Sequence, residues 1–219
     1  CGTGSTTMAI AEALPRGGGV VGIDVSAPMI ADAKVRAAAA DSEARFVVAD
    51  AQTHDFPERT YDLLVSRFGV MFFADPVLSF RNLRKSLRPD GRLVFACWRE
   101  PRENGWMMTP LMAVYKHVPK LPQLAPEAPG PFAFADEARV KRILTDAGFA
   151  DVAMEACPLT IDIAAGKGLE AAVQGALEIG PASRALEGHP PEVAAAAGDQ
   201  GLATGCSPLA AHRSPLHGL

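Results

Sequence analysis

Apolar and polar positions along this chain alternate between two periods. Residues 5–14 carry apolar side chains three or four positions apart, which predicts a helix, and residues 20–24 form a short apolar run typical of a buried strand. The alternation continues through a helix at 29–40, strands at 46–48 and 61–66, a helix at 76–87 and a strand at 93–98. Helices and strands that alternate with short turns favour a parallel sheet covered by helices on both faces.

The second half of the chain is less regular. Residues 100–135 are rich in proline, methionine and aromatic side chains, and we expect an insertion or lid over the carboxyl edge of the sheet. A helix is predicted from Asp136 to Ala147, strands at 152–154 and 161–163, and a helix at 169–179. Neither period is present after residue 193. The prediction is one domain over 1–193 and a disordered or aberrant tail at 194–219.

Composition narrows the classes of function. The 219 residues are 48% hydrophobic, which suits one α/β domain with a full core. A formal net charge of -4 provides no basic surface for nucleic acid, so no nucleic-acid partner is expected. The four cysteines are far apart and form no C-x-x-C pair, which predicts reduced thiols, no metal site and a cytoplasmic location. No apolar run approaches the roughly 20 residues that span a bilayer.

Candidate chemistry lies at three predicted strand ends. Gly2 and Gly4 precede the first helix, where glycines let the backbone approach a ligand. Asp24 ends the next strand about 20 residues later, where a carboxylate can accept hydrogen bonds from both hydroxyls of a ribose. Asp50 ends a further strand and can accept the exocyclic amine of adenine, with the Ala51 amide facing a ring nitrogen. Together they predict an adenosine site, although each has a plainer interpretation as a tight turn, a helix cap or a loop aspartate.

These motifs in this order resemble class I S-adenosylmethionine-dependent methyltransferases, in the branch similar to ubiquinone/menaquinone biosynthesis methyltransferases. The resemblance runs from Cys1 to about Val152. It rests on Cys1-Gly2-Thr3-Gly4, Gly22-Ile23-Asp24-Val25-Ser26, Asp50-Ala51 followed by Phe56-Pro57, Tyr61-Asp62 and Leu87-Arg88-Pro89-Asp90-Gly91-Arg92-Leu93. It implies a Rossmann-like, doubly wound, mostly parallel sheet. Compared with that fold the chain lacks the first and last strands, so we expect a sequence that begins inside its own cofactor loop.

The resemblance also implies roles for individual residues. Gly2 and Gly4 are expected to contact the methionine part of S-adenosylmethionine, Asp24 the ribose and Met29 the face of the adenine. The adenine edge is assigned to Asp50 with Ala51. The segment beneath the sulfonium and the methyl acceptor is expected to be Ser66, Arg67 and Phe68.

Methyl transfer from a sulfonium depends chiefly on alignment of acceptor, methyl and sulfur. The candidate for a catalytic base is His54, although a lone loop histidine is more often solvated. A larger set of side chains either lines an apolar acceptor pocket or packs as core: Phe68, Met71, Phe72, Phe73, Trp106, Met107, Met108, Met112, Phe132 and Phe134. A basic stripe at helical spacing is interpreted as a solvated face: Arg81, Arg84, Lys85 and Arg88.

The leading hypothesis is methyl transfer to a small, apolar or aromatic acceptor through oxygen, nitrogen or carbon. An NAD(P)-dependent Rossmann oxidoreductase shares the glycine loop and the acid at the strand end. Thr7 argues against it, because it stands where G-x-G-x-x-G has its third glycine. A methyltransferase remnant without catalysis is the second alternative, because both ends of the chain depart from the family pattern. The sequence leaves the acceptor and the oligomeric state open.

Overall fold

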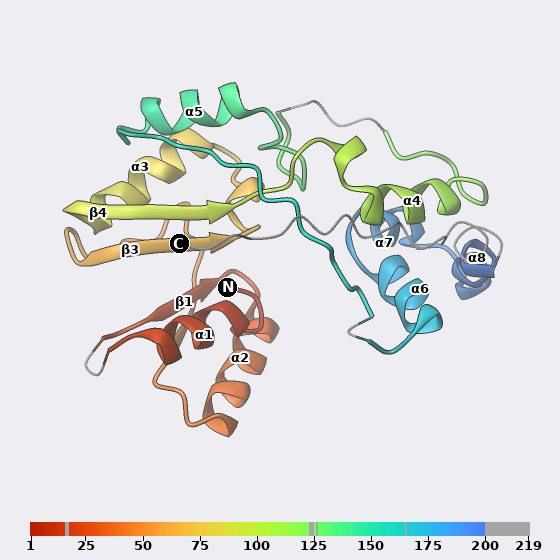
Figure 1. Ribbon diagram of the computed structural model, residues 1–219, viewed down its shortest axis with the longest axis horizontal. Coiled ribbons are helices and arrows are strands. Elements are labelled where there is room, and N and C mark those ends of the chain that lie inside the picture. Colours follow the sequence, from red (N-terminus) through yellow and green to blue (C-terminus); the bar gives the residue numbers. More distant parts are fainter. Residues whose placement is uncertain (16–17, 123–124, 126, 165, 200–219) are drawn as a thin grey trace, which may run out of the picture. The chain divides into compact units, whose positions relative to one another are not determined.

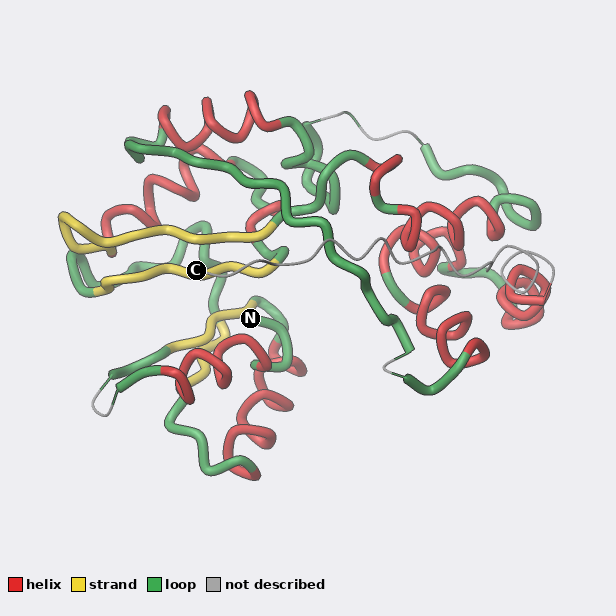
Figure 2. Tube along the Cα trace, viewed as in Figure 1, coloured by secondary structure: helices red, strands yellow, loops and turns green. Residues whose placement is uncertain are grey.

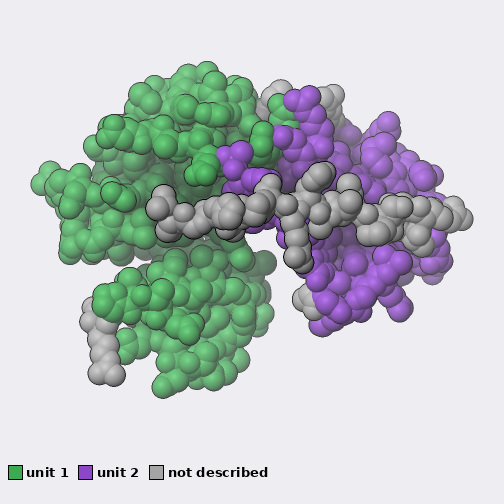
Figure 3. Space-filling model, in the orientation of Figure 1, with its two compact units in different colours: residues 1–100, 125–155 green, residues 101–124, 156–219 purple. Residues whose placement is uncertain are grey.

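The chain folds into two compact units. The computed structural model describes residues 1–15, 18–122, 125, 127–164 and 166–199. Unit 1 comprises residues 1–100 and 125–155, and unit 2 comprises residues 101–124 together with those from 156 onward (Figure 3). The domain expected over 1–193 is therefore divided. Segment 101–124 of the expected insertion belongs with the later part of the chain.

Unit 1 alternates helices and strands as predicted (Figure 1). Its elements are α1 (Ser5–Ala13), β1 (Val21–Asp24), α2 (Ala27–Ala39), β2 (Arg45–Val48), β3 (Tyr61–Arg67), the 3-10 helix η1 (Val70–Phe72), α3 (Pro76–Ser86), β4 (Leu87–Ala96) and α5 (Glu137–Asp146). Three of the helices begin at side-chain caps, in which Ser26, Asp75 and Asp136 each accept a hydrogen bond from the backbone N–H three residues later. Such caps satisfy amide groups that have no partner inside the helix.

The strands pair in parallel, which confirms the predicted α/β class. Gly22 of β1 lies opposite Phe46 of β2, and Val65 of β3 lies opposite Val94 of β4. The single sheet that we expected is divided in two, because β1 pairs only with β2 and β3 only with β4 among the described residues (Figure 2). One edge of β1 and one edge of β3 are therefore open within this part of the chain.

Strand β4 differs from its prediction. The sequence predicted a helix at 76–87 and a strand at 93–98, with residues 88–91 outside both, but the strand runs from Leu87 to Ala96 and includes these residues. Leu87 pairs with Tyr61 and Arg92 with Leu63, so four residues of β4 face Asp62 alone. Residues 88–91 therefore form an irregularity inside the strand.

Helices α1 and α2 cover one face of the first sheet, whereas one face of the second sheet exposes Leu63, Val65 and Val94. Gly22 and Phe46 face α1 and α2, where Phe46 packs with Ile30, Ala33 and Ala37. The neighbouring residue Ile23 points to the opposite face, because side chains alternate along a strand. There it packs against the main core beneath α3 and α5, which consists of Phe56, Val70, Met71, Phe80, Leu83, Ala133, Phe134, Val140, Ile143, Leu144 and Ala147.

The sequence predicted two later strands, and both predictions are wrong. Residues 152–154 and 161–163 are outside helices and strands in the described structure. Val152 and Met154 nevertheless pack against the main core of unit 1. The apolar residues of this segment are thus buried although they form no strand. A strand also needs the edge of a neighbouring strand with which to form backbone hydrogen bonds.

Unit 2 is helical in its described part. It contains the 3-10 helix η2 (Pro101–Glu103), α4 (Gly105–Val114), α6 (Leu169–Glu178), α7 (Gly180–Leu186) and α8 (Pro191–Ala197). Its core is formed by Leu111, Ala113, Val114, Val118, Leu177, Ala182, Ala185 and Ala197.

Helix α8 continues into the predicted tail as far as Ala197, which is fully buried. The composition of 194–219 did not indicate a helix there, but burial of Ala197 in the core of unit 2 stabilises the end of α8. Residues 200–219 of that tail lie outside the described residues. Among the helices of the described chain, none combines the length and apolar character that crossing a bilayer requires.

We predict that Gly22→Ala lowers the free energy of unfolding by about 1–3 kcal/mol, because an added methyl group overpacks the space between β1 and α1. A Cβ atom at Gly22 would lie 2.8 Å from Thr7 Oγ1 and 2.9 Å from the Phe46 ring. The matched control is Gly19→Ala, whose Cβ atom would lie 3.7 Å from its nearest neighbour. Urea denaturation followed by circular dichroism measures both. Equal stability of the two variants would contradict the packing argument.

Candidate functional site

The glycine loop lies against the carboxyl end of β1. The amino nitrogen of Cys1 donates to Ile23 O at 2.8 Å and to Asp24 Oδ2 at 2.9 Å, and the Gly2 amide donates to the same carboxylate oxygen at 2.7 Å. Gly2 has a φ of 57° and Gly4 a φ of 84°, a region that disfavours residues with a side chain. The structure therefore brings Gly2, Gly4 and Asp24 together as the sequence predicted.

Gly4 also explains how closely α1 approaches β2. A Cβ atom at Gly4 would lie 2.8 Å from the ring of Phe46 and 3.0 Å from Ala33 Cβ. Gly22 on β1 makes a similarly close approach to Thr7. The close packing of helix on strand that the third glycine of G-x-G-x-x-G normally allows is here provided by Gly22 on the strand, while Thr7 is buried.

Asp24 collects the hydrogen-bond donors at this strand end. Its Oδ1 accepts from the Ser26 amide at 3.0 Å, and its Oδ2 accepts from Gly2 and Cys1. Burial by itself raises the pKa of the Asp24 carboxyl, but the hydrogen bonds from Ser26, Gly2 and the Cys1 ammonium outweigh it and hold the pKa below its ordinary value of 3.8. Asp24 is therefore a carboxylate near neutral pH and retains lone pairs for further donors.

Apolar side chains are exposed beside this carboxylate. Val25, which follows β1, is 67% exposed, and Met29 in the first turn of α2 is 46% exposed. Met29 was assigned to the adenine face. Ser26 Oγ accepts the Met29 amide at 3.4 Å and so fixes the start of this turn. Exposed apolar groups next to a fixed carboxylate suit a flat base attached to a ribose.

Asp50 forms its own turn after β2. Its carboxylate accepts the Gln52 amide at 2.9 Å, and its backbone O accepts the His54 amide at 2.8 Å. Ala51 packs against the main core. The plainer interpretation of Asp50 as a loop aspartate thus describes its contacts within the chain, while its assignment to adenine stays a prediction.

Gln52 is a site residue that the sequence analysis did not identify. Its side-chain nitrogen lies 3.3 Å from both carboxylate oxygens of Asp50, and its Oε1 accepts the Ala74 amide at 2.6 Å. One side chain therefore connects the loop after β2 with the segment after β3. A lone glutamine in a loop has no sequence signal, because both of its partners are determined by the fold.

The exit of β3 carries Ser66, Arg67 and Phe68. Ser66 Oγ accepts the Gly69 amide at 3.3 Å, and Arg67 is exposed. Phe68 has a φ of 64° and stacks on Trp98, with ring centroids 3.9 Å apart and planes 5° apart. Trp98 was also missed by the sequence analysis, since it lies 30 residues from its partner.

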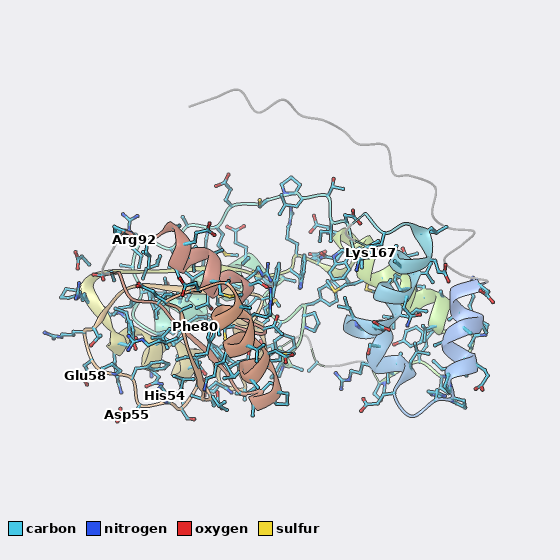
Figure 4. All side chains as sticks on the ribbon, turned by 90° about the horizontal axis from the view of Figure 1, so that it is seen from below. His54, Asp55, Glu58, Phe80, Arg92 and Lys167 are labelled. Carbon is cyan, nitrogen blue, oxygen red and sulfur yellow. The ribbon has the colours of Figure 1, made fainter. Side chains whose placement is uncertain are left out.

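His54 is the candidate base, and the structure places it against Phe56 and α3. Its ring contacts Phe56 edge-on, with centroids 4.7 Å apart, and its backbone O accepts Asn82 Nδ2 of α3 at 2.9 Å. His54 lies beside Asp55 at the margin of unit 1, whereas Phe80 marks the core (Figure 4). Its position beside the middle of α3 favours a packing role over catalysis.

Several side chains considered for an acceptor pocket are core. Met71 and Phe134 are buried in unit 1, and Met107 is buried in unit 2. Phe72 and Met112 are exposed.

The sequence analysis interpreted the basic stripe as a solvated face, but two of its residues also contact other parts of unit 1. Arg81 donates to the Asp146 carbonyl at the end of α5, and Arg88 pairs with Asp62. A cation at a helix carboxyl end is favoured by the helix dipole.

Residues 1–91 match the family described as methyltransferase domain. This range contains the glycine loop, Asp24, Asp50 and the exit of β3. Residues 1–91 are therefore similar to methyltransferase domains. This similarity agrees with the methyltransferase resemblance that the order of the motifs indicated.

Relatives of this methyltransferase domain are named for different acceptors. The chain is 40% identical over 93 residues to the demethylmenaquinone methyltransferase of Thermus thermophilus, and the match covers 42% of each chain. It is 29% identical over 156 residues to phosphoethanolamine N-methyltransferase 1 of Arabidopsis thaliana, which covers 71% of this chain and 28% of that protein. The chain thus spans less than half the length of either relative.

A solved structure shares the fold. The SAM-dependent methyltransferase of Aquifex aeolicus superposes with a TM-score of 0.51 at 20% identity, over 67% of each chain. The Rossmann-like fold class expected from the sequence is therefore confirmed.

We predict that stability falls in acid through Asp24. Its pKa is lower in the folded chain than in the unfolded chain, so its contribution is present above the ordinary pKa of 3.8 and is lost as the pH falls through the folded value. Asp24→Asn should therefore lose less stability between pH 5 and pH 3 than the original chain. Urea denaturation at several pH values measures this, with Asp32→Asn, an exposed residue of α2, as control. The same acid loss in the original chain and in Asp24→Asn would contradict the assignment.

We also predict that Gln52→Ala lowers the free energy of unfolding by about 1 kcal/mol, because the Ala74 amide loses its acceptor. Thermal unfolding should show a lower midpoint. The exposed neighbour Thr53 supplies the control Thr53→Ala, which should leave the midpoint unchanged. A Gln52→Ala midpoint equal to that of the control would show that this connection does not stabilise the loop.

Proposed function

We propose that this methyltransferase domain binds S-adenosylmethionine at the carboxyl ends of β1 and β2 and transfers its methyl group to a small molecule. The observation that carries the proposal is the Asp24 carboxylate, held by the amides of Gly2 and Ser26 within a chain whose residues 1–91 match the family. The earlier assignments of Gly2, Gly4, Asp24, Met29, Asp50, Ala51, Ser66 and Arg67 to this cofactor are part of the proposal.

The side chains and the loop suit such a cofactor. A Cβ atom at Gly2 would have no neighbour within 4 Å, so the loop faces open space above β1. Asp24 offers carboxylate oxygens to ribose hydroxyls, which donate hydrogen bonds. Exposed Val25 and Met29 offer apolar surface to the base. Acceptors for the sugar and apolar contacts for the ring therefore lie next to each other in sequence and in space.

The residues of the chain bind and orient in this proposal. S-adenosylmethionine supplies an activated methyl group on a sulfonium. Asp24 holds the ribose end, and the turn of Asp50, fixed by Gln52, holds the adenine edge. The exit of β3 at Ser66, Arg67 and Phe68 then faces the acceptor. Because alignment supplies much of the acceleration, no general base is assigned, and His54 is not part of the mechanism.

The composition of the chain and its family match support the proposed location, acceptor class and reaction. Among the described cysteines, Cys1, Cys97 and Cys157 are free, which supports a cytoplasmic location with reduced thiols. The net charge of -4 supports a small-molecule acceptor over nucleic acid. The match to methyltransferase domains favours methyl transfer over hydride transfer by an oxidoreductase.

We predict saturable binding of S-adenosylmethionine and S-adenosylhomocysteine, measured by calorimetry on the full chain. Asp24→Ala should weaken both by about 10- to 100-fold, because a charged acceptor for two hydroxyls is lost. The matched control is Asp32→Ala on the exposed side of α2, which should bind as the original chain does.

Circular dichroism and thermal unfolding show whether each variant is folded. Equal binding by Asp24→Ala and the original chain would refute the proposed site. A cooperatively folded chain without any cofactor binding would favour the alternative of a remnant that no longer catalyses methyl transfer.

A further inference from the structure

Arg36 connects the second helix to the glycine loop. It lies in the last turn of α2, and its Nη1 donates to Thr3 O at 2.9 Å, to Thr3 Oγ1 at 2.8 Å and to Ser5 Oγ at 3.1 Å. Arg36 follows Thr3 by 33 residues in the chain, so the fold alone brings them together. One side chain therefore reaches the loop before α1 and the first residue of that helix.

The loop is attached to the rest of unit 1 on two sides. On one side the Gly2 amide donates to Asp24 Oδ2 at 2.7 Å. On the other side Arg36 holds Thr3, which stands between two glycines that both have a positive φ. Because glycines allow more backbone conformations than other residues, a loop of this composition needs contacts from outside to keep one shape. Arg36 supplies such contacts at the middle of the loop.

Arg36 also takes the place of a helix cap. Helix α1 begins after Gly4, which has no side chain and forms no side-chain cap. Arg36 is instead bonded to the Thr3 carbonyl and the Ser5 hydroxyl, on either side of Gly4. Its own place at the carboxyl end of α2 is favourable, because the helix dipole attracts a cation there. The start of α1 is therefore fixed by a residue of α2.

The plainer interpretation is a surface contact without consequence. Arg36 is exposed, and exposed polar contacts contribute little to the free energy of unfolding. Loops open locally, however, with free energies far below that of global unfolding, so a contact of modest strength still restricts them. A ligand that binds an ordered loop loses affinity when it must first order that loop. An effect of Arg36 is therefore expected in the loop and in binding rather than in global stability.

We infer that Arg36 is a positioning residue, which holds the glycine loop in the conformation that the cofactor binds. The inference rests on the proposed function and adds to it a residue outside the strand ends. Arg36 acts through Thr3 and Ser5, whose oxygens accept its hydrogen bonds, and its role requires no contact with the cofactor.

The first test follows the loop without any ligand. NMR measures hydrogen exchange at the amides of Gly2 and Gly4, which donate to Asp24 Oδ2 and to Cys1 O. Arg36→Ala should accelerate this exchange by about three- to tenfold, because the loop opens more often. The matched control is Lys34→Ala, which removes an exposed cation from the same helix and should leave the exchange unchanged.

The second test measures the affinity of the full chain for S-adenosylhomocysteine by calorimetry. Arg36→Ala should weaken binding by about three- to tenfold, while Lys34→Ala should bind as the original chain does. Arg36→Lys should recover part of the loss, because an ammonium also donates several hydrogen bonds although its side chain is shorter.

A double-mutant cycle separates positioning from direct attraction of the ligand. Thr3→Val removes the hydroxyl that accepts from Arg36. If Arg36 acts through Thr3, Arg36→Ala should weaken binding less in a chain that already carries Thr3→Val. Additive effects of the two substitutions would overturn the inference. Circular dichroism shows whether each variant is folded, and Thr3→Val replaces Arg36→Ala in both tests if the latter unfolds.

The inference and the proposed function fail in different ways. Unchanged exchange at Gly2 and Gly4 in Arg36→Ala would overturn the inference. If S-adenosylhomocysteine binds the original chain and Arg36→Ala equally, the cofactor site stands and the positioning role is wrong. If it binds neither chain while Arg36→Ala still accelerates exchange, the proposed function fails, whereas the attachment of the loop by Arg36 stands.

Discussion

The carboxylate of Asp24 is the contact on which the glycine loop depends. It accepts hydrogen bonds from Cys1, Gly2 and Ser26, and so joins the loop before α1, the end of β1 and the start of α2. These three segments meet at one carboxylate because α1 leads the chain away from the loop and β1 returns it, so that the end of β1 lies beside the loop. The site therefore has a negative charge at a fixed position, surrounded by backbone amides that keep it ionised.

Close packing beneath the loop makes this arrangement possible. The ring of Phe46 fills the space that Cβ atoms at Gly4 and Gly22 would occupy, which allows α1 and α2 to lie close to the first sheet. The glycines thus serve two purposes, since Gly4 also begins the helix in the left-handed conformation. Loop geometry and helix packing are consequently coupled, and a substitution at either glycine would disturb both.

The two ends of the proposed site have different chemistry. Polar groups and backbone amides form the end at Asp24, while the stacked rings of Phe68 and Trp98 form the exit of the second sheet. Relatives named for demethylmenaquinone and for phosphoethanolamine are both similar to this chain.

The sequence by itself determined the helices with local signals, such as those capped by Ser26 and Asp136, and the order of glycines and acids at the strand ends. These features depend on residues three or four apart, or on a strand and the turn that follows it. Only the tertiary structure decided the division into two sheets, the role of Gln52 between two loops, and the stacking of Phe68 on Trp98. Each of these joins segments that are distant in the chain, and no local period specifies which side chains meet across a folded core.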